Sequence, residues 1–264
     1  MNIVLLEPDQ IDSAEWCITS PSQLQHLQQH VQLNVGDTLR VGVRNGQRYL
    51  TEVLSSSEQQ IIVKPLQVEA VPEKLPVHLI LALPRPKALR RIIMDAVTLG
   101  VERISLIHSY RVDKSYWQTP FLTKLNDYVT LGLEQAGDTI EPEIQLYKRF
   151  KPFVEDVLPT LITEQKPAYV AHPYAALPMP HAIQQGCSVI IGPERLPSDV
   201  LRQPNFKDGN CCFTYFRTVV YLRILLICER FRQDHRDTLS LPVQGMESKR
   251  LAHRTLRPPI PEFH

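Results

Sequence analysis

Hydrophobic and polar positions follow two different patterns along the chain, with a change near residue 72. In the first part, short stretches rich in β-branched residues are separated by turn residues, which is typical of β-strands. The predicted strands are Asn2–Leu6, Thr38–Val43, Gln47–Leu54 and Gln60–Val68. Asn45-Gly46 between two of them predicts a tight hairpin, and a short helix fits Ser22–Val31.

From residue 77 onward, buried strands alternate with amphipathic helices. Val77–Leu83 is a continuous apolar run, and the stripe of apolar positions that follows predicts a helix over Pro86–Leu99 that ends at Gly100. The remaining predicted strands are Arg103–His108, Ala168–Ala171 and Ser188–Ile191, and the remaining helices are Phe121–Ala136 and Arg217–Phe231. This alternation predicts an α/β fold with a parallel sheet that helices cover on both faces.

Proline density rises at Pro65, Pro72 and Pro76, and we expect a domain boundary there. The predicted domains are a small β domain over 1–72 and an α/β domain over 73–235. Residues 236–264 are rich in Pro and Arg and have no periodicity, so we expect a disordered tail.

Composition narrows the function classes. Only ten of the 264 residues are Gly, and neither GxGxxG nor GxxxxGK[ST] is present, so no Gly-rich phosphate loop is expected. No apolar run reaches the roughly 18 residues that span a bilayer, and the start lacks a secretory signal. The five Cys contain no CxxC and the nine His contain no HExxH, so we expect free thiols, no metal site and a cytoplasmic protein.

Charge is uneven although the net charge is only +1. Residues 1–72 carry four basic against eight acidic side chains, whereas later segments are net positive. A polyanion would therefore be bound by local patches rather than by global attraction.

Two predicted strands run directly into polar or Gly-containing segments, at Tyr169–Pro173 and Ser188–Glu194. Because ligands of parallel sheets bind beyond the carboxyl ends of strands, both exits are candidate binding segments. A plain turn after each strand is the alternative. Glu134 and Gln135 lie on the helix predicted over Phe121–Ala136 and are most simply surface positions.

Basic and aromatic residues follow the same strand ends. The cations are Arg85, Lys87, Arg90, Arg91, Arg111, Lys114, Lys148 and Arg149, and the aromatics are Tyr110, Tyr116, Trp117 and Phe150. Cations interleaved with stacking side chains suit single-stranded or loop RNA. The alternatives are a solvated helix face for the cations and core packing for the aromatics.

Several strings, in this order and spacing, carry a family resemblance over about residues 1–194. They are His26-Leu27 with Gly36-Asp37, LALPRPKALRRI over 81–92, Leu99-Gly100-Val101, the segment Ser109–Ser115, Glu134-Gln135 with Pro142, and Ile190–Glu194. Together they resemble the RsmE family of 16S rRNA (uracil-N3) methyltransferases, which belongs to the SPOUT (trefoil-knot) class.

This resemblance implies a PUA-like RNA-binding β-barrel followed by a SPOUT-like knotted methyltransferase domain. It also implies a homodimer, S-adenosyl-L-methionine (SAM) as methyl donor, and N3 of a uridine in 16S rRNA of the small ribosomal subunit as target. The implied catalytic residues are Glu194 and Arg217. The implied cofactor-binding residues are Ala171, His172, Pro173, Ile191, Gly192, Pro193, Glu194, Cys211, Cys212 and Phe216. The expected RNA-binding residues are His26, Arg40 and the eight cations named above.

The chain departs from the family pattern after Glu194. Arg195 begins the segment where two glycines are usual, Cys212 replaces a glycine, and Val219 and Val220 replace a glutamate and a threonine. These departures keep open an RNA-binding protein on the same scaffold without transfer activity. A small-molecule enzyme using the same cleft is a third, weaker alternative. The abrupt loss of the pattern also fits a shifted reading frame.

Overall fold

The structure is a computed structural model that describes residues 2–11, 14–109, 112–163, 165–171 and 186–192. All structural statements below concern these residues. The helix expected over Arg217–Phe231, the expected tail over 236–264 and the expected knot lie outside them.

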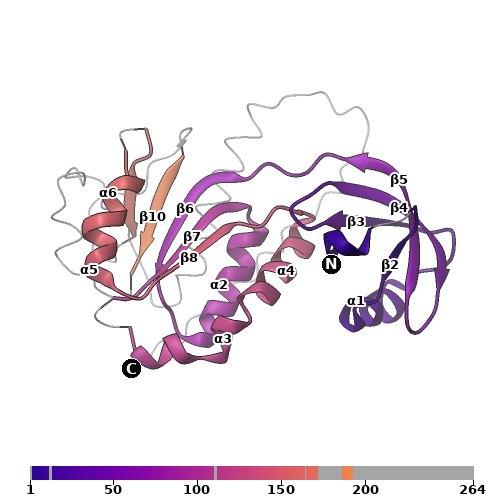
Figure 1. Ribbon diagram of the computed structural model, residues 1–264, viewed down its shortest axis with the longest axis horizontal. Helices are drawn as coiled ribbons and strands as arrows, with labels where there is room; N and C mark the ends of the chain where they lie inside the picture. The colour runs from indigo at the N-terminus through magenta and orange to yellow at the C-terminus, as the bar shows by residue number, and fades with distance from the viewer. Residues whose placement is uncertain (1, 12–13, 110–111, 164, 172–185, 193–264) are drawn as a thin grey trace, which may run out of the picture.

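The first part of the chain forms a five-stranded sheet in the order β1-β3-β4-β5-β2 (Figure 1). Its strands are β1 (Val4–Leu6), β2 (Trp16–Ile18), β3 (Thr38–Val43), β4 (Arg48–Ser56) and β5 (Ile61–Glu69). Asn45 adopts a left-handed conformation (φ 55°) in the β3–β4 turn, which confirms the predicted hairpin. β1 and β2 lie at the two edges, so the described strands form an open sheet and a closed barrel is not shown.

A helical segment packs against this first sheet and confirms the helix predicted over Ser22–Val31. It consists of α1 (Pro21–His26) and the π-helical η2 (Leu27–Val31). Leu24 and Leu27 are buried in the core of the first sheet together with Val41, Val53 and Ile61. Below, "first unit" means this helical segment and the strands β1–β5.

The second part of the chain forms a five-stranded, fully parallel sheet in the order β8-β7-β6-β10-β9. Its strands are β6 (Leu75–Ala82), β7 (Val101–Ile107), β8 (Glu143–Tyr147), β9 (Ala168–Ala171) and β10 (Cys187–Ile191). The predicted parallel α/β sheet is therefore confirmed. "Second unit" means these strands and the helices between them.

Helices cover both faces of this sheet (Figure 1). α2 (Pro86–Thr98) and α4 (Leu125–Ala136) lie on one face, and α5 (Phe150–Pro152), η4 (Phe153–Val157) and α6 (Leu158–Leu161) lie on the other. Right-handed crossovers explain this division, because β6–β7–β8 step across the sheet in one direction and the β8–β9 connection returns in the opposite direction.

The helix predicted over Phe121–Ala136 is divided. α3 (Pro120–Thr123) and α4 are separated at Lys124, whose backbone (φ −100°, ψ 15°) leaves the helical region. A short 3-10 helix, η3 (Lys114–Gln118), precedes α3. Gly100 ends the α2 region with φ 83°, which confirms its predicted role.

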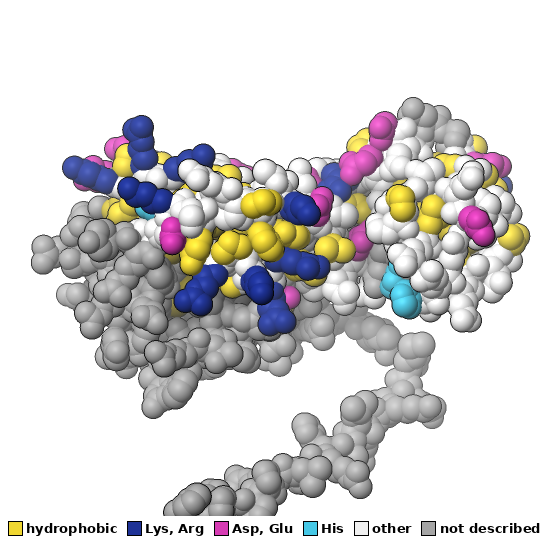
Figure 2. Space-filling view, turned by 90° about the horizontal axis from the view of Figure 1, so that it is seen from below, with side chains coloured by type: hydrophobic (Ala, Val, Ile, Leu, Met, Phe, Trp, Pro, Cys, Tyr) yellow, Lys and Arg dark blue, Asp and Glu magenta, His cyan; other side chains and the backbone are white. Residues whose placement is uncertain are grey.

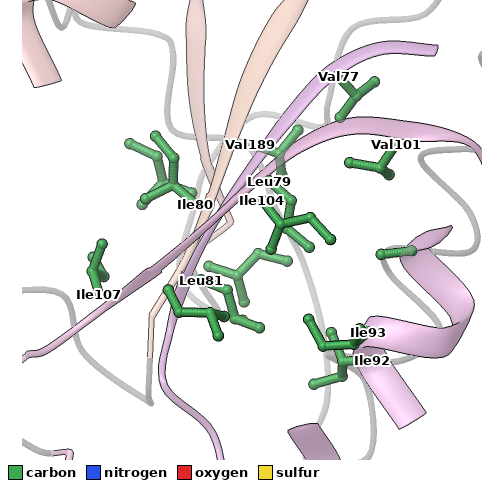
Figure 3. Close-up of a cluster of buried hydrophobic side chains, with 14 of the residues drawn as sticks. Val77, Leu79, Ile80, Leu81, Ile92, Ile93, Val101, Ile104, Ile107 and Val189 are labelled. Atoms are coloured by element: carbon green, nitrogen blue, oxygen red, sulfur yellow. The ribbon is translucent and has the colours of Figure 1, made fainter. Parts of the chain in front are cut away.

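Alternate residues of the central strands pack on opposite faces of the sheet. Leu79, Leu81 and Ile104 lie toward Ile92 and Ile93 of α2, whereas Ile80 and Ile107 point the other way (Figure 3). All of them are buried, with at most 3% of their surface exposed. The sheet is therefore the middle layer of the second unit, with buried aliphatic side chains on both of its faces.

Gly132 allows α2 and α4 to approach closely. A Cβ atom there would lie 2.7 Å from Val97 Cβ and 2.8 Å from the Met94 carbonyl oxygen. The Thr98 hydroxyl donates to the carbonyl oxygens of Met94 (2.8 Å) and Gly132 (3.2 Å). One of the few glycines in the chain is therefore needed for helix packing.

Candidate functional site

The strand order reverses direction beside β6. The chain runs from β6 outward through β7 to β8, and then returns on the other side of β6 as β9 and β10. β10 pairs directly with β6, with Ile191 opposite Leu81. In open parallel sheets, ligands bind outside the carboxyl ends of the strands at such a reversal, so this edge is the candidate functional site.

The two predicted strand exits lie next to one another at this reversal. Ala171 ends β9 and is opposite Ile191, which ends β10. Gly192 follows β10 directly and is partly exposed. The other predicted catalytic and cofactor-binding residues lie outside the described residues: His172, Pro173, Pro193, Glu194, Cys211, Cys212, Phe216 and Arg217.

Most of the predicted RNA-binding cations follow carboxyl ends of the same sheet, at an edge that we call the rim. Arg85 precedes α2 directly after β6, Lys114 begins η3 after β7, and Lys148 and Arg149 follow β8. These four side chains are exposed, as are Lys87, Arg90 and Arg91 on α2, and Arg111 lies outside the described residues. Figure 2 shows Lys and Arg side chains gathered over the second unit beside a band of apolar side chains.

Two predicted RNA-binding residues are not at the rim. Arg40 lies on β3 of the first unit and forms an ion pair with Glu69 (3.1 Å). His26 ends α1, with its ring 5.4 Å from that of His30, and desolvation, followed by repulsion from the N-terminus and His30, lowers its pKa. The structure therefore does not bring these two side chains together with the cations of the second unit.

Glu134 is buried at the junction between the two units, so its prediction as a surface position is wrong. Its side chain accepts a hydrogen bond from Gln23 Nε2 (2.7 Å), and its backbone carbonyl accepts one from Asn2 N (2.8 Å). Burial raises the pKa of the Glu134 carboxyl, and the hydrogen bond from Gln23 opposes that shift. Gln135 is exposed, as expected. The sequence did contain a sign that Glu134 is more than a surface residue, because Glu134 is one of the residues on which the family resemblance depends.

A second set of polar contacts joins the units near the end of α4. The Arg44 guanidinium contacts Glu7 (2.7 Å), Glu141 (2.5 Å) and the Thr130 hydroxyl (2.8 Å). The Asn45 side chain also donates to Glu141 (3.1 Å). The first unit is thus attached to the helix that leads into β8.

A cavity of about 610 Å³ lies between α1, α2 and α4, and His26, Asp95 and Glu134 are among its lining residues. It is separate from the strand ends that form the rim. Among the described residues, no group of three or more His, Cys, Asp or Glu is arranged to hold a metal ion. Within the same residues, every helix is too short or too polar to cross a bilayer.

Comparison with known proteins shows what the second unit is similar to. Residues 71–197 match the family model of the RNA methyltransferase domain. The parallel sheet and its rim therefore lie within the segment that matches this family model.

A curated relative is similar over part of both chains. Ribosomal RNA small subunit methyltransferase E of Treponema pallidum (strain Nichols) is 29% identical over 164 residues, which are 58% of this chain. The match spans 59% of the relative's length.

Solved structures show the same fold over most of the chain. A probable rRNA methyltransferase from Porphyromonas gingivalis superposes with a TM-score of 0.64 at 15% identity, covering 90% of this chain and 100% of that one. Ribosomal RNA small subunit methyltransferase E from Neisseria gonorrhoeae, bound to S-adenosyl methionine, gives 0.62 at 12% identity, covering 85% and 96%. With the family match, these findings confirm the resemblance to RsmE-type SPOUT methyltransferases.

Proposed function

We propose that this protein is a SAM-dependent methyltransferase that modifies N3 of a uridine in 16S rRNA of the small ribosomal subunit. The observation that carries the proposal is the reversal of strand order at β6 and β10, within the segment that matches the RNA methyltransferase domain. The names of the relatives from Treponema pallidum and Neisseria gonorrhoeae support the small-subunit substrate, and the latter was solved with S-adenosyl methionine.

The described strand ends fit a bound SAM molecule. Ala171 and Ile191 are neighbours, and Gly192 has no side chain that would block approach to the backbone. In the proposed site, His172, Pro173, Pro193, Glu194, Cys211, Cys212 and Phe216 complete the cofactor contacts. Bound SAM supplies an electrophilic methyl group on a sulfonium centre.

The protein's own contribution is to hold the uridine in line with that methyl group. Arg85 and Lys87 lie beside the β6–β10 reversal and are suited to holding RNA phosphates. Because N3–H of uracil is a weak acid, the site must accept its proton or stabilise the developing negative charge. Glu194 and Arg217 are our proposed residues for these tasks.

The proposed organisation follows the same family. Residues 1–72 would form a PUA-like RNA-binding domain, residues 73–235 the methyltransferase domain, and residues 236–264 a tail. We also propose a homodimer that acts in the cytoplasm. The first unit supports an RNA-binding role only indirectly, through its hydrogen bonds to Glu134 on α4 and to Glu141 after α4.

A transfer assay tests this function. Small ribosomal subunits that lack the modification are incubated with the purified protein and methyl-labelled SAM, and nucleosides are analysed by mass spectrometry. We expect 3-methyluridine in 16S rRNA, and we expect Gly192→Leu to abolish it by obstructing the strand exit. Glu102→Gln, an exposed change on β7, is the matched control. Methylation of another atom or another RNA would contradict the proposal.

The second candidate function is RNA binding without methyl transfer. Arg195, Cys212, Val219 and Val220 favour it, because bulky or apolar residues replace those usual in loops that surround the cofactor. Calorimetric titration with SAM separates the candidates. Binding supports the methyltransferase, whereas no binding at millimolar SAM, with RNA binding intact, supports the second candidate.

A further inference from the structure

His108 and Trp117 form a hydrogen-bonded aromatic pair at the rim. Trp117 Nε1–H donates to His108 Nδ1 over 2.8 Å, and the ring centroids are 6.1 Å apart at an interplanar angle of 54°. His108 directly follows β7, and Trp117 lies on η3. Both side chains are only partly buried, so the pair is not enclosed in the core.

Backbone pairing places basic residues beside this pair. His108 N–H donates to the Tyr147 carbonyl oxygen (2.9 Å), which continues the β7–β8 pairing one step beyond β7. Lys148 and Arg149 follow Tyr147 immediately, and Lys114 begins the same short helix that carries Trp117. The aromatic pair therefore lies between cations from two neighbouring loops.

These three cations are free of ion pairs to any residue that the structure describes. Asp113, which directly precedes Lys114, caps η3 by accepting a hydrogen bond from Ser115 N (2.9 Å). Exposed, unpaired cations next to a partly exposed indole are the combination that binds the backbone and bases of single-stranded nucleic acid.

We propose that Trp117, held by its hydrogen bond to His108, is a stacking platform for an unpaired RNA base that neighbours the methylated nucleotide, with Lys148 and Arg149 binding its phosphates. This proposal rests on the proposed action on RNA. β7 is separated from β10 by β6 alone, which corresponds to about 10 Å between their carboxyl ends. The platform is thus too far from Gly192 to receive the target base itself and close enough for a neighbouring nucleotide.

The hydrogen bond between Trp117 and His108 also predicts which bases the platform prefers. Because His108 Nδ1 accepts from Trp117, the neutral imidazole carries its proton on Nε2. Nε2–H makes no hydrogen bond to a described residue and can donate to a carbonyl oxygen. Uracil and guanine present such oxygens on their base edges, so we expect them to be preferred over adenine.

Trp117 itself reports on the platform. The chain has two tryptophans, and the other, Trp16, is buried in the first unit against Tyr49. In a Trp16→Phe background, single-stranded oligouridylate should quench the Trp117 emission saturably, whereas duplex RNA of equal length should not. Trp117→Ala should weaken oligouridylate binding in a filter assay about tenfold or more, and Trp117→Phe should weaken it less.

The phosphate contacts have a separate measurement. Lys148→Ala and Arg149→Ala should each reduce the slope of log K against log salt by about 0.7. Lys64→Ala, at an exposed position on β5, is the matched control and should change neither slope nor quenching. Circular dichroism verifies that each variant is folded, and Trp117→Phe, which retains an aromatic ring, covers the case in which Trp117→Ala does not fold.

Two outcomes overturn the platform. One is RNA binding that leaves the Trp117 emission unchanged at saturation. The other is equal affinity of the parent protein, Trp117→Ala and Trp117→Phe. Both measurements use RNA without SAM, so failure of methyl transfer leaves the platform intact, and failure of the platform leaves the transfer assay unaffected.

Discussion

The Gln23 side chain donates a hydrogen bond to Glu134 Oε1 over 2.7 Å and joins residues that are 111 positions apart. Gln23 also donates to the Leu5 carbonyl oxygen (2.9 Å), so one amide holds α1, β1 and α4 together. Both side chains are at least nine-tenths buried. The contact therefore helps to fix the position of the first unit against α4 of the second unit.

Glu134→Ala should destabilise the protein because it leaves the buried Gln23 amide without one partner. We expect the free energy of unfolding in urea to fall by about 1–3 kcal/mol. Glu134→Gln retains an acceptor for Gln23 and should lose less. Equal stability of all three proteins would show that water replaces the lost contact.

Arg44 and Glu141 should couple energetically across the junction. Their side chains are 18% and 30% exposed, so solvent screens the pair only partly. A double-mutant cycle with Arg44→Met and Glu141→Gln should give a coupling energy of about 0.5–3 kcal/mol from denaturant unfolding. A coupling near zero would mean that Glu7 and Thr130 satisfy Arg44 without Glu141.

Gly132→Ala should be destabilising although alanine favours helices. The new methyl group would meet the Met94 carbonyl oxygen and Val97 at less than 3.0 Å, so α2 and α4 must move apart. We expect a loss of about 1–3 kcal/mol, seen as a lower melting temperature. Gln135→Ala on the exposed face of α4 is the control, and its melting temperature should stay near that of the parent protein.

His78 should make stability depend on pH. Desolvation, followed by repulsion from Arg103 and Lys166, lowers its pKa to about 4, and its ring is hydrogen-bonded to the Ser105 hydroxyl (2.8 Å). Its pKa is lower in the folded than in the unfolded chain, so its contribution is complete above pH 6.5 and is lost as pH falls toward 4.

As the pH is lowered from 6.5 to 4, the free energy of unfolding should fall by up to about 3 kcal/mol because of His78. His78→Gln keeps a hydrogen-bonding group for Ser105 and should flatten this part of the profile. A profile that is as steep in the variant as in the parent would assign the dependence to other groups.

The coding DNA offers a test of the altered region after Glu194. The family match ends at residue 197, and Arg195, Val219 and Val220 differ from the residues that are usual in the RsmE family at those positions. If the reading frame has shifted, translation of the downstream DNA in another frame should restore the glycines, glutamate and threonine of the family. Absence of that pattern in both other frames excludes a shift.

The central strands and α2 could be predicted because long apolar runs and a helical stripe are local signals. The edge strands β2 and β8 were missed because three and five residues are too few to give a clear periodicity. The helical turns over 150–161 were missed because Pro152 and Pro159 interrupt the pattern there. Lys124 divides a helix whose apolar stripe continues across it.

The candidate site also has features that could be predicted from the sequence and features that could not. Strand exits at Ala171 and Ile191 are visible in sequence, and their pairing in the sheet follows from the parallel fold. The burial of Glu134 could not be predicted from its neighbours, because Gln23 lies far away in sequence. The ion pair of Arg40 could not be predicted for the same reason, because its partner Glu69 lies on another strand of the first unit.

The contacts of Glu134 and Arg44 mean that the two units are connected twice, once by the backbone between Glu69 and Leu75 and once by non-covalent bonds to the α4 region. Pro72 and Glu73 in the backbone connection are exposed. A chain cut there would yield two fragments that these non-covalent contacts would still join. The protein is therefore a candidate for fragment complementation, in which separately expressed halves reassemble without a covalent link.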